Sequence, residues 1–225
     1  MSDKPFTWAY STANMFKTCP KQYYHLKVLK DYTENFDTPD MTYGKEFHKA
    51  AENYIGKDES LPAKFEFARS VLDKIKTMEG AKLCEYRIGL TEKMQPCAFF
   101  AKDVWLRAVI DLAILNGKEA RVIDYKTGGN TAWADKGQLE LMSLVLFKHH
   151  PEVNVVKSGL LYVVANAFIR ETYSVENEAA LWAKWLGTVG EIQKARRTNV
   201  WNPKPSGLCN KHCIVESCIH NGRNS

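Results

Sequence analysis

The stretch ARVIDYKTGG, residues 120–129, runs from apolar residues into two charged side chains and ends at two glycines. Side chains of a strand alternate between its faces, so Asp124 and Lys126 share one face while Ile123 and Tyr125 share the other. A carboxylate and an ammonium group therefore lie next to each other where the strand ends. This pattern predicts either a plain ion pair or one part of a metal-assisted active site.

A second acidic residue lies in the apolar run before this strand. The segment RAVIDLAILNGKEARVIDYKTG carries Asp111 and Asp124 on two runs that are joined by the turn Asn116-Gly117. Such a turn predicts an antiparallel hairpin, which brings the two carboxylates close together. Two neighbouring carboxylates repel each other unless a cation lies between them, and Mg²⁺ prefers oxygen ligands of this kind. The structural alternative is that Asp124 pairs with Lys126 and that Asp111 caps a turn.

The rest of the chain predicts an α/β fold. Hydrophobic periodicity indicates helices first, then strands, with later helices between and after them. We expect helices from Ser11 or Thr12 and over 41–55, 62–78, 133–149 and 176–197. We expect strands over 83–90, within 97–115, from 120 and over 158–168, and the segment 169–175 could pair beside the last of them. These elements predict a mixed β-sheet of four to five strands flanked by helices.

We expect one domain over residues 1–225, because the length and apolar content fit a single core. Its parts would be a helical N-terminal part over 1–80, a sheet core over 81–175, a helix over 176–200 and a cysteine-rich tail over 201–225. No apolar run approaches the roughly 20 residues of a membrane helix, and MSDKPFTWAY does not follow the plan of a signal peptide. The sequence therefore predicts a cytoplasmic protein without a membrane partner, and its net charge of +5 is compatible with a polyanionic one.

The cysteines are unevenly distributed. Cys209, Cys213 and Cys218 follow one another as C-x3-C-x4-C near the end of the chain, whereas Cys19 stands near its start. In a cytoplasmic protein, such cysteines are more often thiols or metal ligands than disulfides. A fourth ligand is missing locally, so His212 or His220 could complete a zinc site, or Cys19 could do so if the two ends of the chain meet.

Jointly these motifs resemble the PD-(D/E)XK nucleases of the RecB type. The resemblance rests on D-(x12)-D-Y-K-T-G, on a helical G-x-x-x-H from Gly44 to His48, on the pair Gln138-Leu139 and on the opening YSTANMFKTCPKQYYHL. Relatives of this type include the nuclease domains of RecB and AddB, phage exonucleases and CRISPR-associated exonucleases. The resemblance covers nearly the whole chain and implies a restriction-endonuclease-like core, with the tail folded back to the N-terminal region.

The resemblance also implies roles for the motif residues. It implies a Mg²⁺ or Mn²⁺ site whose ligands are His48, Asp111, Asp124 and the main-chain carbonyl of Tyr125. It implies that Lys126 serves the attacking water, that Glu85 helps a second metal ion or its water, and that Gln138 supports the site or contacts DNA. The family commonly has a tyrosine four residues after this glutamine, whereas this chain has Met142, so part of the DNA contact differs.

For the cysteines, the resemblance implies a [4Fe–4S] cluster held by Cys19, Cys209, Cys213 and Cys218. The spacing departs from the family pattern, because three residues instead of two separate the first pair in the tail. Zn²⁺ is the alternative, and unligated thiols are a third reading. In either metal case we expect a structural role that joins the two ends of the chain.

The expected substrate is DNA, as single strands or free ends. Lys17, Lys21, Tyr23 and Tyr24 could line a strand channel through phosphate pairing and base stacking, or they could form an ordinary solvated helix face. We expect an exonuclease that works in recombination, replication or repair with the proteins of those processes. The alternatives are an endonuclease of the same fold and a non-catalytic DNA-binding module.

Overall fold

The computed structural model describes residues 6–34, 38–132 and 134–224. They form two compact units, which are described separately below. The larger unit contains residues 6–7 and 38–181, and the smaller unit contains residues 8–34 and 182–224. The expectation that residues 1–225 act as one nuclease domain stays a prediction.

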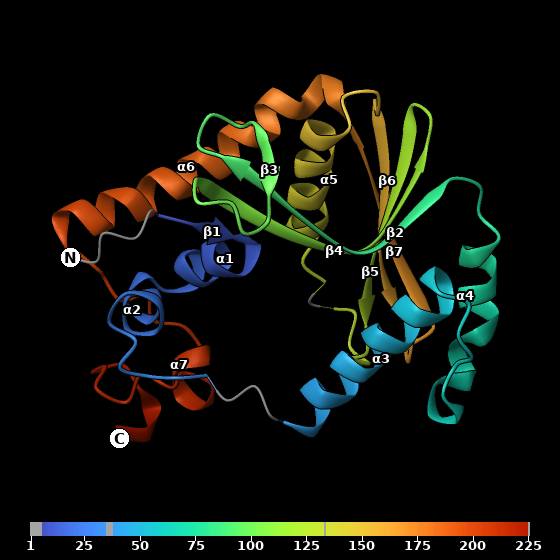
Figure 1. Cartoon of the computed structure of the whole chain (residues 1–225). Coiled ribbons are helices and arrows are strands. Elements are labelled where there is room, and N and C mark those ends of the chain that lie inside the picture. Colours follow the sequence, from blue (N-terminus) through green and yellow to red (C-terminus); the bar gives the residue numbers. More distant parts are fainter. Residues whose placement is uncertain (1–5, 35–37, 133, 225) are drawn as a thin grey trace. The chain divides into compact units, whose positions relative to one another are not determined.

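Six strands of the larger unit form a mixed sheet (Figure 1). They are β2 (Ala81–Thr91), β3 (Pro96–Ala98), β4 (Val104–Asn116), β5 (Glu119–Lys126), β6 (Val155–Tyr162) and β7 (Ala167–Ser174). Their order is β3-β2-β4-β5-β6-β7, and only β5 and β6 of this series pair in parallel. The predicted mixed α/β sheet is confirmed, with more strands than expected.

Helices cover both faces of this sheet. On one face lie α3 (Pro39–Gly56), the 3₁₀ helix η2 (Ala63–Ala68) and α4 (Arg69–Lys76), whose apolar side chains share a core with Ile123 and Tyr125. On the other face lies α5 (Gly137–His149), where the hydroxyl of Ser143 is 2.8 Å from that of Ser158 on β6. Strand β5 is therefore enclosed from both sides, which fixes the position of the residues at its carboxyl end.

The hairpin of β4 and β5 was predicted and is confirmed. Its ladder runs from the pair Asn116–Glu119 to the pair Leu112–Ile123, so Gly117 and Lys118 form the turn. Gly117 has a φ of +59°, a left-handed conformation that glycine adopts without a steric penalty. Asp111 and Asp124 are the next residues along the two strands, where the ladder ends.

The smaller unit joins the two ends of the chain, as the sequence predicts. It contains β1 (Trp8–Ala9), α1 (Tyr10–Thr18), α2 (Pro20–Tyr23), the π-helix η1 (Tyr24–Leu29), most of α6 (Glu178–Thr198), α7 (Leu208–Lys211) and η4 (Gly222–Asn224). The 3₁₀ turn η3 (Val175–Asn177) precedes α6 in the larger unit. In the tail, the Ser217 amide donates to the Tyr32 hydroxyl at 3.0 Å, and Lys204 Nζ donates to the Lys17 carbonyl at 2.9 Å.

Three local predictions need correction. The first helix begins at Tyr10 instead of after Ser11 or Thr12, because the Thr12 hydroxyl accepts the Ala9 N–H at 2.9 Å from inside the first turn. The strand predicted over 158–168 ends earlier, because β6 stops at Tyr162 and a turn with Asn166 at φ +49° leads into β7; the segment 169–175, expected to pair beside it, lies mostly in β7 and does so. The helix predicted from residue 133 begins at Gly137, and Trp133 lies outside the described residues.

No helix within the described ranges is both long enough and apolar enough to cross a membrane.

Candidate active site

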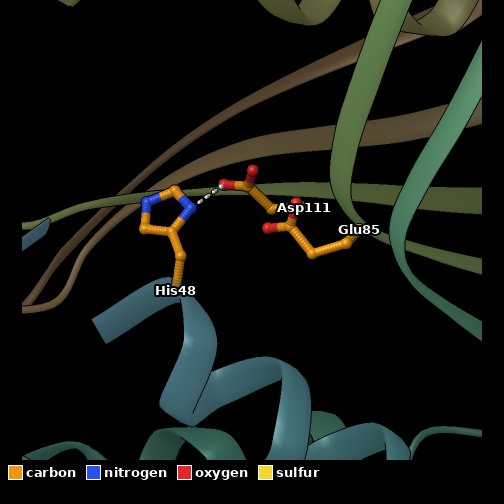
Figure 2. A group of neighbouring side chains, drawn as sticks. All are labelled: His48, Glu85 and Asp111. Atoms are coloured by element: carbon orange, nitrogen blue, oxygen red, sulfur yellow. Dashed lines mark ion pairs between the residues drawn. The ribbon is translucent and has the colours of Figure 1, made fainter. Parts of the chain in front are cut away.

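Three elements of the larger unit bring metal-binding side chains together. His48 comes from α3, Glu85 from β2 and Asp111 from β4, and Figure 2 shows the imidazole and the two carboxylates facing a common space. One donor atom from each lies within 4.8 Å of the others. His48 Nδ1 is 3.3 Å from Asp111 Oδ2. Among the residues that the structure describes, no other three His, Cys, Asp or Glu side chains come close enough together to share one ion.

Glu85 reaches this group because β2 is irregular at that residue. Its φ of +47° is left-handed, which costs a non-glycine residue about 1–3 kcal/mol. In a regular strand Cys84 and Tyr86 would share a face. Instead, Cys84 packs against Gly56 of α3, whereas the Tyr86 hydroxyl lies 3.1 Å from His150 Nε2 beyond the end of α5. The strand thus switches faces at Glu85.

The pairing of β2 with β4 continues through this irregularity. Cys84 pairs with Leu112 and Tyr86 pairs with Ile110, so Glu85 stands opposite Asp111. Two carboxylates face each other across neighbouring strands. Because like charges directly opposite each other destabilise a sheet, this position calls for a cation.

A glycine places the imidazole. A Cβ on Gly44 would lie 3.3 Å from the Thr127 hydroxyl, so the first half of α3 approaches the segment after β5 more closely than a larger side chain comfortably permits. His48 follows one helical turn later on the same face. Its Nε2–H donates to the Tyr125 carbonyl at 3.1 Å. The spacing of the G-x-x-x-H motif is explained by this approach.

The peptide of Tyr125 links the two strands of the hairpin to the imidazole. Its N–H donates to Asp111 Oδ2 at 2.8 Å, one step beyond the last backbone pair of β4 and β5. Its carbonyl accepts from His48 on the opposite side. A carboxylate, a peptide and an imidazole therefore form one connected network at the carboxyl end of β5.

Asp124 and Lys126 also meet as predicted. Lys126 Nζ lies 2.6 Å from Asp124 Oδ2, although that oxygen has no aligned hydrogen bond. Gln138, in the first turn of α5, donates from Nε2 to Asp124 Oδ1 at 2.6 Å and accepts from Lys126 Nζ at 3.0 Å. One amide thus holds both the carboxylate and the ammonium group. The expected ion pair is present, and Asp124 is close enough to Asp111 and His48 for their charges to affect it.

The site carries excess negative charge. Burial and the neighbouring Asp111 carboxylate raise the pKa of Asp124 to about 6, although Lys126 opposes the shift. Burial and Asp111 also raise the pKa of Glu85. Burial lowers the pKa of His48, but the surrounding carboxylates, Asp111 first, outweigh burial and raise it. Each shift favours proton uptake where the protein holds no cation, so a divalent ion would relieve the repulsion.

An open groove borders the three donors. Three basic side chains stand along it, two from α3 and one from β2: Lys45, Lys49 and Arg87. Glu52 also lines the groove and pairs with Lys49 at 2.9 Å, so Lys45 and Arg87 leave a basic excess, which suits a polyanion that must reach an acidic centre.

The structure changes the relative positions of the predicted ligands. Glu85, which was expected to help a second ion or its water, lies in the group with His48 and Asp111. Asp124, which was expected to be a ligand, lies next to that group but is held by Lys126 and Gln138. Met142, which replaces the family's tyrosine, is 6% exposed within α5 and lies in the apolar core.

The four cysteines of the smaller unit line one cavity, together with the imidazoles of His212 and His220. Two sulfurs accept backbone N–H groups at 3.4 Å, Cys19 from Lys204 and Cys209 from Ser206. Burial raises the pKa of the Cys213 thiol, the Val215 amide opposes this, and the other three thiols add to it. Cys19 therefore lies at the same cavity as the C-x3-C-x4-C segment, which is what a shared metal site would need.

The aromatic part of the predicted DNA channel is less accessible than expected. Tyr23 is 3% exposed, and its ring stacks on Trp201 at 5.9 Å, so its faces are not open to a base. Tyr24 stacks on Trp201 at 5.1 Å and keeps part of its surface exposed. Lys17 is exposed with its ammonium group 5.6 Å from the Trp185 ring, and Lys21 borders the cysteine cavity.

Comparison with known proteins agrees with this geometry. The family model of the PD-(D/E)XK nuclease superfamily matches residues 7–218, and the chain belongs to this superfamily. Membership implies a metal-dependent hydrolase that acts on nucleic acid. The mixed sheet between helices is the restriction-endonuclease-like core that such a protein requires.

Two solved structures share the fold at low sequence identity. SSO0001 is 12% identical, with a TM-score of 0.51 over 98% of this chain and 90% of that one. A protein from Eubacterium rectale named "Putative exonuclease" is 11% identical, with a TM-score of 0.55 over 91% of this chain and 86% of that one. No curated protein sequence matches the chain.

Proposed function

We propose that the protein is a Mg²⁺- or Mn²⁺-dependent DNA exonuclease of the RecB-like type. The observation that carries the proposal is the convergence of His48, Glu85 and Asp111 beside the Asp124–Lys126 pair. Ion-binding donors and a lysine for the attacking water are the two parts that metal-assisted hydrolysis needs in one place.

The donor set fits a hard divalent cation. One donor atom from each of His48, Glu85 and Asp111 lies within 4.8 Å of the others, and carboxylates with an imidazole are ligands that such an ion accepts. We propose His48, Glu85, Asp111, Asp124 and the Tyr125 carbonyl as the set from which ligands are drawn. A bound ion would polarise the scissile phosphate and lower the pKa of a water molecule.

The protein groups around the ion have separate tasks. Lys126, held by Asp124 and Gln138, donates a hydrogen bond to the attacking water and opposes the charge that develops on the phosphate. Gln138 fixes the rotamers of both side chains, so it is a positioning residue. Asp124 becomes fully ionised when a cation compensates its burial and its proximity to Asp111.

The proposal that the enzyme is an exonuclease comes from the family resemblance and from a protein of similar fold. The Eubacterium rectale protein with a similar fold carries an exonuclease name, and we extend that activity to this chain. We propose single strands or free ends as substrate, in recombination, replication or repair, for a cytoplasmic bacterial or phage-encoded enzyme. An endonuclease of the same fold is the alternative, because the site itself does not depend on an end.

The test compares linear and circular DNA in Mg²⁺ and in Mn²⁺. We expect linear DNA to be degraded and covalently closed circles to survive, and Asp124→Ala to lose the activity. Glu119→Ala is the matched control, because it removes an acid from the other end of the same strand, where Glu119 pairs with Lys157 at 2.7 Å. Nicking of circles would establish the endonuclease instead. Equal activity of wild type and Asp124→Ala would refute the catalytic assignment.

For the smaller unit we propose a [4Fe–4S] cluster bound by Cys19, Cys209, Cys213 and Cys218. Backbone N–H groups that point at thiolate sulfurs, as at Cys19 and Cys209, are among the contacts that tune such clusters. The support is that four cysteines around one cavity match the one-plus-three order that the resemblance implies for this cluster. Zinc is the alternative, with His212 or His220 as a possible ligand.

The cluster proposal is tested by purification without oxygen. We expect brown protein that contains iron and inorganic sulfide in equal amounts, and Cys213→Ser to lose both. Colourless protein with stoichiometric zinc would replace the cluster with the zinc site.

A further inference from the structure

A pair of phenylalanines stands on the surface at the β3 edge of the sheet. Phe99 and Phe100 directly follow β3, and Phe100 is 74% exposed. Their rings meet edge to face, with centroids 4.9 Å apart and planes at 84°. The Arg107 guanidinium of β4 lies 5.4 Å from the Phe99 centroid and 5.7 Å from that of Phe100. None of the nuclease motifs accounts for this group.

The aromatic group is held firmly. Two tight turns enclose it, with Ala101 N–H donating to Ala98 O at 2.9 Å and Val104 N–H donating to Ala101 O at 3.3 Å. Edge-to-face packing and the cation over both rings add to the restraint. Phe100 is therefore presented to solvent by a defined backbone, which is the property of a contact surface.

The group lies on the same side of the sheet as the ion-binding donors. Arg87 of β2 borders the groove next to those donors and pairs with Val109 of β4. Arg107 comes two residues before Val109 and lies on the same face. Arg107 precedes Asp111 by four residues, which is about 13 Å at a rise of about 3.4 Å per residue. The exposed Arg87 lies between the aromatic group and the site.

The exposed surface is small and isolated. From residue 81 to residue 116, all of which the structure describes, Phe100 is the only large apolar side chain in the exposed class. Protein partners usually cover about 800 Å² on each side, far more than one ring offers. The basic Lys93 and Lys102 lie in the flanking turns with the acidic Glu92 and Asp103, so charge is nearly balanced there. One open aromatic face matches one nucleobase, which binds by stacking.

We propose that Phe100, supported by Phe99 and Arg107, is a stacking platform for an unpaired base of the DNA strand whose phosphate is cleaved. This inference rests on the proposed function and specifies its substrate: a strand with unpaired bases near the cleavage point. A duplex strand advances about 3.4 Å per nucleotide, so the base is about four nucleotides from the scissile phosphate if stacking persists, and fewer in a stretched strand.

The experiment measures binding separately from cleavage. Fluorescence anisotropy gives the affinity for a labelled single-stranded oligonucleotide in Ca²⁺, which takes oxygen ligands as Mg²⁺ does. We expect Phe100→Ala to weaken binding about fivefold or more and Phe100→Trp to retain it. Phe67→Ala is the matched control, because Phe67 is 52% exposed on η2, away from the sheet edge. The dependence of binding on salt should stay the same in Phe100→Ala, since stacking releases no counterions.

A second readout locates the base. The fluorescent base 2-aminopurine is placed in turn at successive positions of the oligonucleotide. We expect quenching at one position within about four nucleotides of the cleavage point, lost in Phe100→Ala and kept in Phe67→Ala. A blunt duplex, whose bases are all paired, should bind wild type and Phe100→Ala equally.

The outcomes separate the two proposals. Wild-type affinity and quenching in Phe100→Ala would overturn the platform and leave the nuclease assignment intact. A wild type that cleaves no DNA, but whose binding still depends on Phe100, would overturn the nuclease and keep the platform. If Phe100→Ala instead abolishes self-association seen by sedimentation and leaves DNA binding unchanged, the ring contacts a second copy and the inference is wrong.

Discussion

The two candidate metal sites are built in opposite ways. The donors of the larger unit stand on α3, β2 and β4, and hydrogen bonds already connect His48, Asp111 and the Tyr125 peptide. In the smaller unit Cys19 lies between α1 and α2, Cys209 lies in the one-turn helix α7, and Cys213 and Cys218 lie in loops of the tail. A site on regular elements keeps its geometry without the ion, whereas a site on loops depends on the bound ligand to hold those loops in place.

The donor chemistry differs in the same sense. Carboxylates and an imidazole suit a hard cation that exchanges and keeps water, which is useful for hydrolysis. Thiolates suit iron–sulfur clusters or zinc, which bind tightly and stay. We therefore expect the larger unit to use metal for chemistry and the smaller unit to use it for folding.

The largest expected effect tests whether the cysteine site of the smaller unit stabilises its fold. Cys213→Ser should destabilise the smaller unit by several kcal/mol, because a structural metal site contributes its binding free energy to folding. Hydrogen exchange read by mass spectrometry should show faster exchange in residues 8–34 and 201–224 but not in the strands from 81 to 174. Cys97→Ser, at β3 of the larger unit, is the control. Equal protection in both variants would remove the structural role of the cysteines.

The second effect tests whether the site of the larger unit carries out hydrolysis. Lys126→Ala should lower turnover about 100- to 1,000-fold in Mg²⁺, since the group acts on the reacting atoms. Gln138→Ala should cost less, about tenfold, because Lys126 keeps its contact with Asp124. Lys118→Ala, at the hairpin turn, is the control in a single-turnover assay. A Lys126→Ala variant as fast as wild type would show that another group serves the water.

The third effect concerns the stability of the metal-free protein. Because the pKa of Asp124 is raised to about 6, the folded state binds more protons than the unfolded state from about pH 4 to pH 6. Its contribution to stability is complete below about pH 4 and is lost as the pH rises through about 6. Asp124→Asn should therefore be about 1–3 kcal/mol more stable than wild type at about pH 7.5, and equal to it at about pH 4.

Denaturant titrations in chelator at both pH values measure this difference. Mg²⁺ should then stabilise wild type more than Asp124→Asn, because the ion compensates a charge that the amide lacks. A variant less stable than wild type at neutral pH would mean that the Lys126 contact outweighs burial.

The smallest expected effect concerns the backbone strain at Glu85 in the metal-free protein. At Glu85, glycine should be about 1 kcal/mol more stable than alanine, because φ is +47° and only alanine bears the steric penalty. The order should reverse at Arg87, where glycine costs about 0.5–1 kcal/mol in a regular strand. Thermal midpoints of the four metal-free variants decide this. The same order at both positions would mean that β2 relaxes once the Glu85 carboxylate is gone.

Much of the larger site follows from short-range pattern. The hairpin was predictable because Asn116-Gly117 separates two apolar runs, and Asp111 and Asp124 then fall where its ladder ends. The adjacency of Asp124 and Lys126 follows from the period of a strand. In the smaller unit, the cysteines alone left the return of the tail open, and the resemblance to the RecB-type nucleases indicated that the tail lies against Cys19.

The remainder depends on long-range register and on individual dihedral angles. Glu85 joins the donor group because it stands opposite Asp111 and adopts a left-handed conformation, which no propensity of glutamate predicts. Tyr23 is buried because its ring stacks on Trp201, which lies far along the chain and which no local pattern connects to it. The platform at Phe100 had no sequence signal, since Phe99 and Phe100 read as part of an apolar run.

The smaller unit is assembled from both ends of the chain, and this dictates an order of events during synthesis. About 190 residues separate Cys19 from Cys209, so at about 5–20 residues per second the first thiol is made roughly 10–40 s before its partners. The whole strand core is translated in that interval. If the smaller unit binds the proposed cluster, loading could begin only after the sheet has been synthesised, and a cell short of iron or sulfide would accumulate a chain with a finished sheet and an unassembled smaller unit.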